Sequence, residues 1–480
     1  MSVLLFSLEK PELEYYFHEM VQAFKPGIKN VIDTEADWDK KLSQRTLGLT
    51  IEYSIEQQGK ECFVKTYKLS DKKDLGDKGI YKGYLYDFLS DYYKKTLMWG
   101  SLTGIKPVKI VQILEREGLS EQAIKERLVG YYRLSDDRSK LLIDLSKKQL
   151  PFIAAGQKKI GIYIGIPLCP SKCSYCSFVS TLVDRKKENL RQYFNNLLLE
   201  IDAIAGLLKQ KRLVIDSIYI GGGTPTVLDT EQLEKLFFII KQNFDINNLR
   251  EFTLEAGRTD TLTVEKLRIA KDNGVDRICL NPQSMNQQTL DAVKRPCQVE
   301  DIKNYVSIIR ELGFKILNMD LIIGLGNEGA DDFLNSLDQV ISYSPENITI
   351  HNLSIKKGSK IKNDFGISVD DGYGEDFYQK VRQILLKAAY DPYYLYRLKY
   401  TAGNSENIGY AKSGAEGIYN IMMMSEKQTI IGIGAGATGN IYFEKSDEIK
   451  KIFTVKDIKT YNDRFEKIVE KKCRMISEAL

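Results

Sequence analysis

The sequence predicts an α/β protein whose centre is a partial barrel of six strand–helix units. Three observations lead to this prediction. From residue 158 onward, apolar strand-like segments alternate with amphipathic helical segments. Strands that follow one another through helices run parallel, with right-handed crossovers. Every unusual polar motif of this region comes directly after a predicted strand, which is where the site of a parallel α/β barrel lies.

The six units define a core over residues 151–392. Its strands are predicted at 160–166, 214–220, 251–256, 275–281, 315–323 and 347–353. Its helices are predicted at 185–209, 230–243, 262–273, 298–312, 331–342 and 373–389. Because the polar motifs gather at the strand ends, we expect the sheet to curl into a partial barrel and not to lie flat as a doubly wound sheet.

Residues 1–150 form an extension of different character. We expect a small α/β module over 1–75, with a helix at 11–24, strands at 46–53 and 61–68, and Gly59 in the turn between the strands. Helices follow at 82–97, 108–117, 120–131 and 136–148, with Ser120 as an N-cap. The turn Trp99-Gly-Ser-Leu-Thr-Gly-Ile-Lys-Pro107 between two of them suggests no chemistry by residue type, so this part is expected to be a helical packing or lid domain.

Residues 393–480 form a C-terminal α/β region. A strand beginning at Thr429 runs into a turn with Gly432, Gly434 and Gly436. Such glycines allow close approach of the backbone, either to a ligand or to another part of the chain in a tight turn. A closing helix is expected over 455–480.

The composition limits the possible partners. The 480 residues carry 69 basic and 65 acidic side chains, a net charge of +4 that gives no argument for binding nucleic acid. No run of 18 apolar residues is present, so no membrane span is expected. The apolar start lacks the basic region of a signal peptide. Together with unpaired cysteines, this predicts a cytoplasmic protein.

Three of the seven cysteines, Cys169, Cys173 and Cys176, lie in one loop with C-x3-C-x2-C spacing. A cubane iron–sulfur cluster normally takes four thiolates, whereas this loop supplies three. One iron would then stay open to a small molecule. A structural zinc site requires four ligands, usually as two separated pairs. The sequence has no second cysteine pair, and its only histidines are His18 and His351, so a zinc site is not favoured.

Polar residues at the following strand ends suggest what that molecule is. They are the turn Gly221-Gly-Gly-Thr-Pro-Thr226, then Glu255, Gln283, Arg295 and Asp320. Asp320 stands among apolar residues, and a buried charge of this kind is either paired or bound to a ligand. Carboxylates can hold ribose hydroxyls or an ammonium, an arginine can grip a carboxylate, and glycine backbone can accept from an amine. S-adenosylmethionine carries all of these groups.

These motifs resemble the radical S-adenosylmethionine superfamily. The set Tyr163-Ile-Gly-Ile-Pro167, the cysteine loop, the glycine turn, Gln283, Arg295 and Asn318-Met-Asp-Leu-Ile-Ile-Gly-Leu325 is similar to the oxygen-independent coproporphyrinogen III oxidase family. The segments 99–107, Glu255-Ala-Gly-Arg258 and 396–410 resemble its HemZ branch.

The resemblance implies a partial (β/α)6 radical S-adenosylmethionine barrel, and it implies roles for particular residues. Cys169, Cys173 and Cys176 would hold a [4Fe–4S] cluster. The contacts to S-adenosylmethionine would come from Tyr163, Tyr175, Gly222, Gly223, Thr224, Glu255, Gln283, Arg295 and Asp320. Of these, Gly222, Gly223 and Thr224 would bind the methionine part and Arg295 its carboxylate.

The implied reaction is an oxidative decarboxylation. A radical made from S-adenosylmethionine would take hydrogen from a propionate of coproporphyrinogen III, and two rounds would give the vinyl groups of protoporphyrinogen IX. A flavodoxin or ferredoxin would donate electrons. No catalytic side chain is identified.

Three positions depart from the oxidases. Phe178 stands where the oxidases carry a further cysteine, as it does in the family's haem-chaperone branch. Cys297 stands where related sequences often have a histidine. Gly165 stands where the oxidases have a histidine. A haem chaperone, or another radical enzyme of tetrapyrroles such as one that opens haem, therefore remains an alternative. Arg258, Arg277 and Arg397 could contact substrate carboxylates, although surface salt bridges are the more ordinary role.

Overall fold

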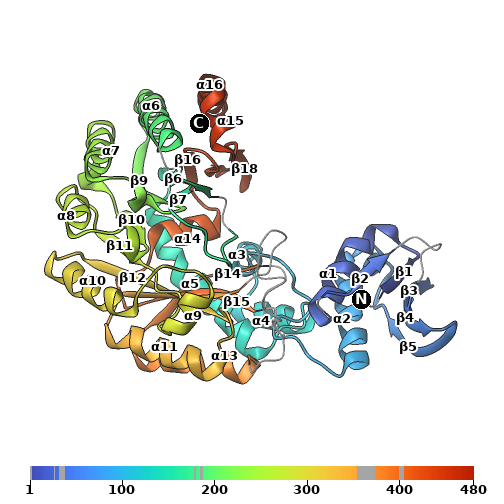
Figure 1. Ribbon diagram of the computed structural model, residues 1–480. Helices are drawn as coiled ribbons and strands as arrows, with labels where there is room; N and C mark the ends of the chain where they lie inside the picture. The colour runs from blue at the N-terminus through green and yellow to red at the C-terminus, as the bar shows by residue number, and fades with distance from the viewer. Residues whose placement is uncertain are drawn as a thin grey trace. The chain divides into compact units, whose positions relative to one another are not determined.

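The computed structural model describes residues 3–25, 27–31, 38–177, 180–183, 187–353, 373–398 and 405–480. The chain forms two compact units (Figure 1). The first comprises residues 1–146 and 397–406, and the second comprises 147–396 and 407–480. A short C-terminal segment thus belongs to the N-terminal unit.

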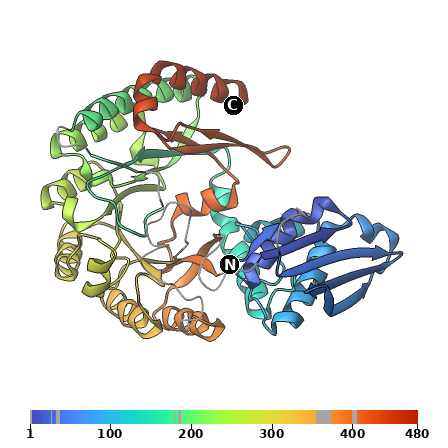
Figure 2. The same ribbon diagram turned by 45° about the vertical axis from the view of Figure 1, so that its right-hand side comes forward.

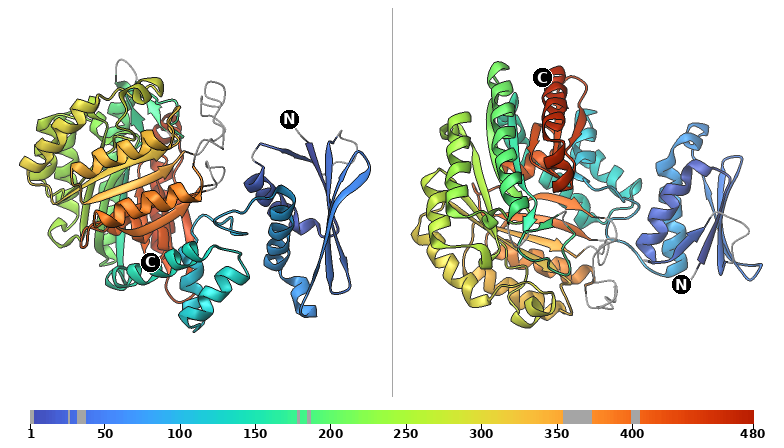
Figure 3. Two further views of the ribbon diagram at one scale, coloured as in Figure 1. Left: turned by 90° about the horizontal axis from the view of Figure 1, so that it is seen from below. Right: turned by 45° about the horizontal axis from the view of Figure 1, so that its top comes forward.

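The N-terminal unit begins with a five-stranded sheet covered on one face by two helices (Figure 3). The strand order is β2-β1-β3-β4-β5, with β1 parallel to β2 and β3 and an antiparallel meander from β3 to β5. The strands are β1 (Val3–Leu8), β2 (Lys29–Val31), β3 (Lys40–Leu47), β4 (Thr50–Gln57) and β5 (Lys60–Lys68). Helices α1 (Glu14–Phe24) and α2 (Lys78–Tyr93) pack on it through a core that includes Phe17, Tyr53 and Phe88.

The prediction of one strand over 46–53 is wrong. Residues 48 and 49 form the turn between β3 and β4, and Gly48 adopts the left-handed conformation, with φ +63°. Apolar residues on both sides of this turn imitate a single alternating strand. The expected turn at Gly59 does join β4 to β5, with φ +73°.

Helices complete the N-terminal unit. They are α3 (Val108–Arg116), α4 (Glu121–Gly130) and α5 (Asp136–Ala155), the last of which continues into the second unit. The Ser120 side chain caps α4 by accepting a hydrogen bond from the Ala123 backbone N–H at 3.3 Å. Helix α5 is longer than predicted and includes Pro151.

A buried polar cluster joins the turn at Trp99 to the C-terminal segment of this unit. The indole N–H of Trp99 donates to Glu406 Oε2 at 2.7 Å, and Arg138 pairs with Glu406 Oε1 at 3.1 Å. Arg397 lies over the Trp99 ring, 4.9 Å from its centroid, and donates to the Leu102 carbonyl. The turn for which the sequence suggested no chemistry is therefore a packing site for residues almost 300 positions away.

The second unit is built on an eleven-stranded curved sheet with parallel central strands. The six predicted strands are β6 (Lys159–Ile166), β9 (Val214–Gly222), β10 (Glu251–Gly257), β11 (Arg277–Leu280), β12 (Ile316–Ile323) and β13 (Asn347–Asn352). A seventh parallel strand, β16 (Thr429–Ile433), lies beside β6. The prediction of a partial α/β barrel is confirmed, with this C-terminal strand added to it.

Helices cover the outer face of the curved sheet (Figure 2). They are α6 (Glu188–Gln210), α7 (Thr230–Asn243), α8 (Val264–Asp272), α10 (Val299–Glu311), α11 (Ala330–Ser342) and α13 (Glu375–Lys387). Side chains from alternate strand positions, such as Ile162 and Ile164, are fully buried. The other positions of the same strands point into the barrel and carry the polar groups of the candidate site.

Antiparallel strands extend the sheet at both edges. Strands β14 (Asp391–Arg397) and β15 (Glu406–Ala411) follow β13, and β17 (Thr438–Phe443) and β18 (Glu448–Phe453) follow β16. Helix α14 (Ile418–Ser425), which the sequence did not predict, lies inside the curve. The Glu251 side chain on β10 accepts the Ile418 backbone N–H at the helix N-terminus, at 2.5 Å.

The glycine turn after β16 packs against protein. A Cβ atom at Gly434, whose φ is +98°, would lie 2.6 Å from the Gly165 carbonyl oxygen. Its N–H donates to Glu200 on α6, which is paired with Lys472. The closing helix is divided into α15 (Ile458–Asp463) and α16 (Phe465–Ala479). Among the described residues, no helix has the length and apolar character needed to cross a membrane.

Candidate functional site

The three cysteines lie in the connection from β6 to α6, at the carboxyl end of the parallel strands. Short strands β7 (Leu168–Cys169) and β8 (Thr181–Leu182) pair in parallel and give the loop its shape. Cys169 and Cys173 are buried and Cys176 is half-buried. The Cys176 N–H donates to the Cys173 carbonyl at 3.2 Å, which closes a tight turn between these two thiols. Phe178 lies outside the described residues.

The donor set of this loop suits a cluster better than a single ion. Within the described ranges, no three His, Cys, Asp or Glu side chains converge on one point in metal-binding geometry. A cubane bonds each thiolate to a different iron, so its ligands need not converge on one point. Three thiols on one short loop, two of them buried, are suitable ligands for such a cluster.

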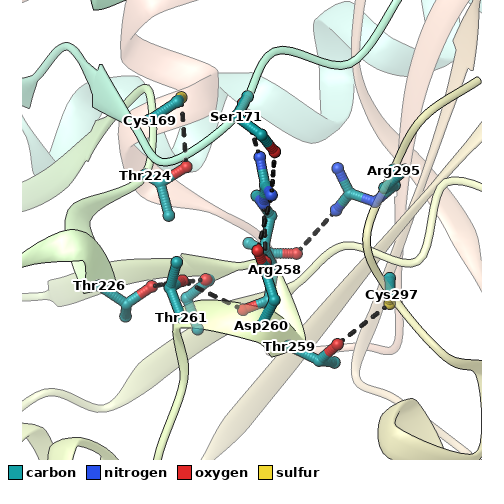
Figure 4. A network of polar contacts seen from close by, with 12 residues as sticks. Cys169, Ser171, Thr224, Thr226, Arg258, Thr259, Asp260, Thr261, Arg295 and Cys297 are labelled. Atoms are coloured by element: carbon teal, nitrogen blue, oxygen red, sulfur yellow. Dashed lines mark hydrogen bonds and ion pairs between the residues drawn. The ribbon is translucent and has the colours of Figure 1, made fainter. Parts of the chain in front are cut away.

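The glycine turn after β9 lies against the cysteine loop. A Cβ atom at Gly223 would lie 2.9 Å from Cys169 Sγ and 2.7 Å from the Leu168 carbonyl oxygen. The Thr224 hydroxyl lies 3.3 Å from Cys169 Sγ (Figure 4). Gly222, with φ +123°, donates its N–H to Glu255 Oε2 at 3.2 Å. Only glycine allows this approach, which forms a cradle beside the first cysteine.

Glu255 lies on β10 in an aromatic environment. The Tyr219 hydroxyl donates to Glu255 Oε1 at 2.5 Å. The Tyr219 ring stacks on Tyr419 of α14 and on Tyr163 of β6, with centroid distances of 4.5 and 6.2 Å. Burial raises the pKa of Glu255 from 4.5 to about 7, with a further contribution from the nearby Asp320 charge. This carboxyl can therefore change its protonation state near neutral pH.

Gln283 and Asp320 meet between β11 and β12. Gln283 has φ +70°, a strained conformation for a residue other than glycine, and its backbone N–H donates to the Asp320 carbonyl at 2.8 Å. Asp320 Oδ1 accepts from Asn318 at 2.8 Å. The backbone of Gln283 is thereby held beside Asp320, and its side-chain Oε1 is buried.

His351 was not predicted to belong to this group. Its Nε2 lies 3.5 Å from Asp320 Oδ2, and its Nδ1 lies 3.2 Å from the hydroxyl of Tyr396 on β14. A lone histidine late in a predicted strand gives no signal of this kind. Only the side-by-side placement of β12 and β13 reveals the contact.

Arg295 is buried and already has several partners. Its guanidinium donates to the Tyr175 hydroxyl at 3.0 Å and to the carbonyl oxygens of Gly257 and Asn281 at 2.9 and 2.5 Å. Its Nε, together with Gln283 Oε1 and Asn281 Oδ1, is buried and finds no hydrogen-bond partner among the residues that the structure describes. Three unpartnered polar atoms near one rim fit a polar ligand bound there, because such atoms are otherwise costly to bury.

The loop after β10, residues 257–261, contacts each neighbouring part of the site (Figure 4). Arg258 donates to Ser171 in the cysteine loop. The Thr261 hydroxyl lies 2.7 Å from that of Thr226 in the glycine turn, and the Thr259 hydroxyl donates to Cys297 Sγ at 3.2 Å. The sequence singled out Arg258 but not these contacts, because the partners of the loop are 35 to 87 positions away.

The sequence suggested surface salt bridges as the ordinary role of Arg258, Arg277 and Arg397, and this prediction is wrong. Arg258, Arg277 and Arg397 are only 3 to 5% exposed. Arg277 faces Glu251 at 3.6 Å and donates to the Ala415 carbonyl at 2.7 Å. Each of the three supports neighbouring backbone or buried side chains.

The structure also shows where Gly165 and Cys297 lie, the other two positions that differ from the oxidases. Gly165 is at the end of β6, and a Cβ atom there would lie 3.3 Å from the Tyr163 ring. Cys297 is 3% exposed and lies two residues after Arg295 in the same loop.

Comparison with known proteins extends these observations. Residues 163–340 match the model of the radical SAM superfamily. The chain is 35% identical over 91% of its length to the oxygen-independent coproporphyrinogen-III oxidase-like protein HemZ of Bacillus subtilis, of which it covers 89%. It is 30% identical over 63% of its length to the heme chaperone HemW of Haemophilus influenzae, covering 75% of that protein.

A solved structure shares the fold. Coproporphyrinogen III oxidase (HemN) from Escherichia coli, described as a radical SAM enzyme, superimposes with a TM-score of 0.53 at 19% sequence identity. The match covers 68% of this chain and 73% of that one.

Proposed function

The chain belongs to the radical S-adenosylmethionine superfamily and within it to the HemN/HemZ family, and on that premise we propose that it oxidatively decarboxylates propionate groups of coproporphyrinogen III. The cofactors of this family are a [4Fe–4S] cluster and S-adenosylmethionine. The observation that carries the proposal is the gathering of three cysteines, a glycine cradle and unpartnered polar atoms at one rim of the barrel.

Each part of the rim has a place in this proposal. Cys169, Cys173 and Cys176 hold the cluster, and Gly222, Gly223 and Thr224 hold the methionine end of S-adenosylmethionine. Arg295 faces its carboxylate through the unpartnered Nε. The remaining amino, ribose and adenine groups fall to Gln283, Asp320 and Glu255, with Tyr163 and Tyr175 beside them.

The bound cofactors supply one-electron cleavage of S-adenosylmethionine and an organic radical that abstracts hydrogen. The protein orients the substrate and keeps water out. The stacked rings of Tyr163, Tyr219 and Tyr419 form an aromatic interior beside Glu255. A flavodoxin or ferredoxin is the proposed electron donor.

A haem chaperone is the second candidate, favoured by the likeness to HemW and by Phe178 in place of a further cysteine. The surroundings of His351 weigh against axial haem ligation there. Both of its ring nitrogens face other groups, Tyr396 and Asp320, and would have to leave them to bind iron.

One anaerobic assay separates the two functions. Reconstituted protein is mixed with a reductant, S-adenosylmethionine and coproporphyrinogen III, and the products are followed by mass spectrometry. Methionine formation coupled to carbon dioxide loss is the expected result. Tight haem binding without turnover would overturn the proposed reaction and support the chaperone.

The cluster ligands can be tested by substitution. Cys176→Ala is expected to lose the cluster absorbance and nearly all iron, because two thiolates cannot hold a cubane in place. Cys279→Ala is the control, since Cys279 is a buried cysteine that lies within β11 and outside the cysteine loop. The measurement is iron and sulfide per chain after anaerobic reconstitution. A Cys176→Ala protein that keeps four irons would show that the ligands are assigned wrongly.

A further inference from the structure

Arg258 reaches from the end of β10 into the middle of the cysteine loop. Its Nη1 donates to the Ser171 carbonyl at 2.9 Å and its Nη2 to the Ser171 hydroxyl at 2.7 Å. Ser171 is between the first two cysteines, two residues from each. One buried guanidinium therefore fixes both the backbone and the side chain at the centre of this loop (Figure 4).

Asp260 fixes the guanidinium in turn. Its Oδ1 accepts from Arg258 Nε at 2.8 Å and its Oδ2 from Nη2 at 2.7 Å. This two-bond pairing holds the planar group in one orientation, which a lysine ammonium cannot reproduce. The Arg258 side chain is only 6% exposed and that of Asp260 27%, so water screens this pair less than a surface pair.

We propose that Arg258 is a positioning residue for the cluster, which holds the span from Cys169 to Cys173 in ligand geometry and places a fixed positive charge beside it. This role rests on the proposed cluster ligands. The charge is expected to raise the reduction potential of the cluster, since a nearby cation stabilises the more negative, reduced form. The sequence placed Arg258 in a motif and suggested it as a possible contact to substrate carboxylates, but its contact with the cysteine loop was not predicted.

The two effects can be separated by substitution. Arg258→Lys keeps a positive charge and loses the forked geometry, whereas Arg258→Gln loses both. Partners that support a metal ligand typically change affinity by about 10- to 100-fold when removed. Both variants are therefore expected to lose the cluster to a chelator at least about 10-fold faster than the wild type. Only Arg258→Gln is expected to lower the midpoint potential, which is measured by electron paramagnetic resonance during a redox titration.

Arg250→Lys is the matched control. Arg250 also pairs through two bonds with a carboxylate, Asp216, at 2.7 and 2.5 Å, and donates to the Phe152 carbonyl at 3.2 Å. It lies at the start of β10, the opposite end of the strand from Arg258. This variant is expected to bind and lose the cluster at the wild-type rate and potential.

Ser171→Ala provides a milder test if the arginine variants do not fold. It removes one of the two bonds to Ser171, and an intermediate rate of cluster loss is expected. The proposed role would be overturned if either Arg258 variant lost the cluster at the wild-type rate and kept the wild-type midpoint potential. It would also be overturned if Ser171→Ala lost the cluster at the wild-type rate. If wild-type protein binds no cluster, or if Cys176→Ala keeps it, the ligand assignment fails instead, so the two failures are distinguishable.

Discussion

Glu255 combines two properties that oppose each other. It lies inside the barrel, where burial raises its pKa to about 7, yet it accepts hydrogen bonds from Tyr219 and Gly222, which favour the charged form. The proton is bound more tightly in the folded than in the unfolded protein, because burial outweighs the hydrogen bonds. A cationic ligand group beside Glu255 would shift this balance toward the carboxylate.

This residue predicts a pH dependence of stability. Since the folded pKa is raised above the unfolded value near 4.5, the contribution of Glu255 is fully present below pH 4.5 and is lost as pH rises through about 7. Glu255→Gln cannot ionise, so relative to this variant the cofactor-free wild type is expected to lose at most about 3 kcal/mol across that range. Urea unfolding at several pH values measures the difference. A difference independent of pH would contradict the raised pKa.

At the level of elements, the six parallel strands could be predicted because each is a short apolar run followed by a helix. Strand β16 was recognised as a strand but not as the seventh strand of the barrel. It is separated from β13 by 76 residues, and nothing in the local sequence specifies that it pairs with β6. Helix α14 and the contacts of the loop 257–261 were missed for the same reason. Glu251, which accepts from the N-terminus of α14, is 167 positions away from Ile418. The cysteine loop and the glycine turn could be recognised in the sequence because the residues of each are close together in the chain.

The C-terminal helix α16 is held by one buried ion pair. Lys472 bonds to Glu200 on α6 and donates to the Gly432 carbonyl at 2.8 Å, while the Tyr461 hydroxyl and the Gly434 N–H also donate to Glu200. Both charged side chains are at most 3% exposed. The pair thus links the last helix to the strand that completes the barrel.

Breaking this pair should be costly. Lys472→Met leaves Glu200 charged and buried without its cation, and a loss of about 3 to 5 kcal/mol in unfolding free energy is expected. The control is Lys459→Met, which removes an exposed pair with Asp463 on α15 and should leave stability unchanged. Chemical denaturation measures both. An equal, small effect of the two substitutions would mean that the buried pair does not stabilise α16.

At the level of the whole molecule, the division into units does not follow the order of the chain. Arg397 at the end of β14 and Glu406 at the start of β15 group with the N-terminal unit, where Glu406 meets Trp99 and Arg138. A boundary near residue 150 could be predicted from the change in pattern. The return of ten residues from the far end of the sequence could not, because a buried Glu406 has no local signature.

Glu406→Gln tests this arrangement. The amide keeps the shape of the side chain but removes one of the two carboxylates that face Arg138, the other being Asp137 at 2.6 Å. A loss of about 1.5 to 3 kcal/mol of stability is expected from the N-terminal unit, as for a hydrogen bond to a charged group. Faster hydrogen exchange is expected at Ser101 and Leu102, whose amides are hydrogen-bonded within the unit. The control is Glu416→Gln, which removes a pair with Lys148 inside the second unit. Unchanged exchange at 101 and 102 in Glu406→Gln would contradict the role of the segment.

The same segment has a consequence for biosynthesis. The N-terminal unit leaves the ribosome first, but Trp99 and Arg138 cannot make their contacts to Glu406 until residue 406 of 480 has been made. Domains usually fold in the order in which they are translated. Here the unit that is synthesised first is completed only after most of the barrel has emerged, so a ribosome that stalls before residue 406 leaves it unfinished.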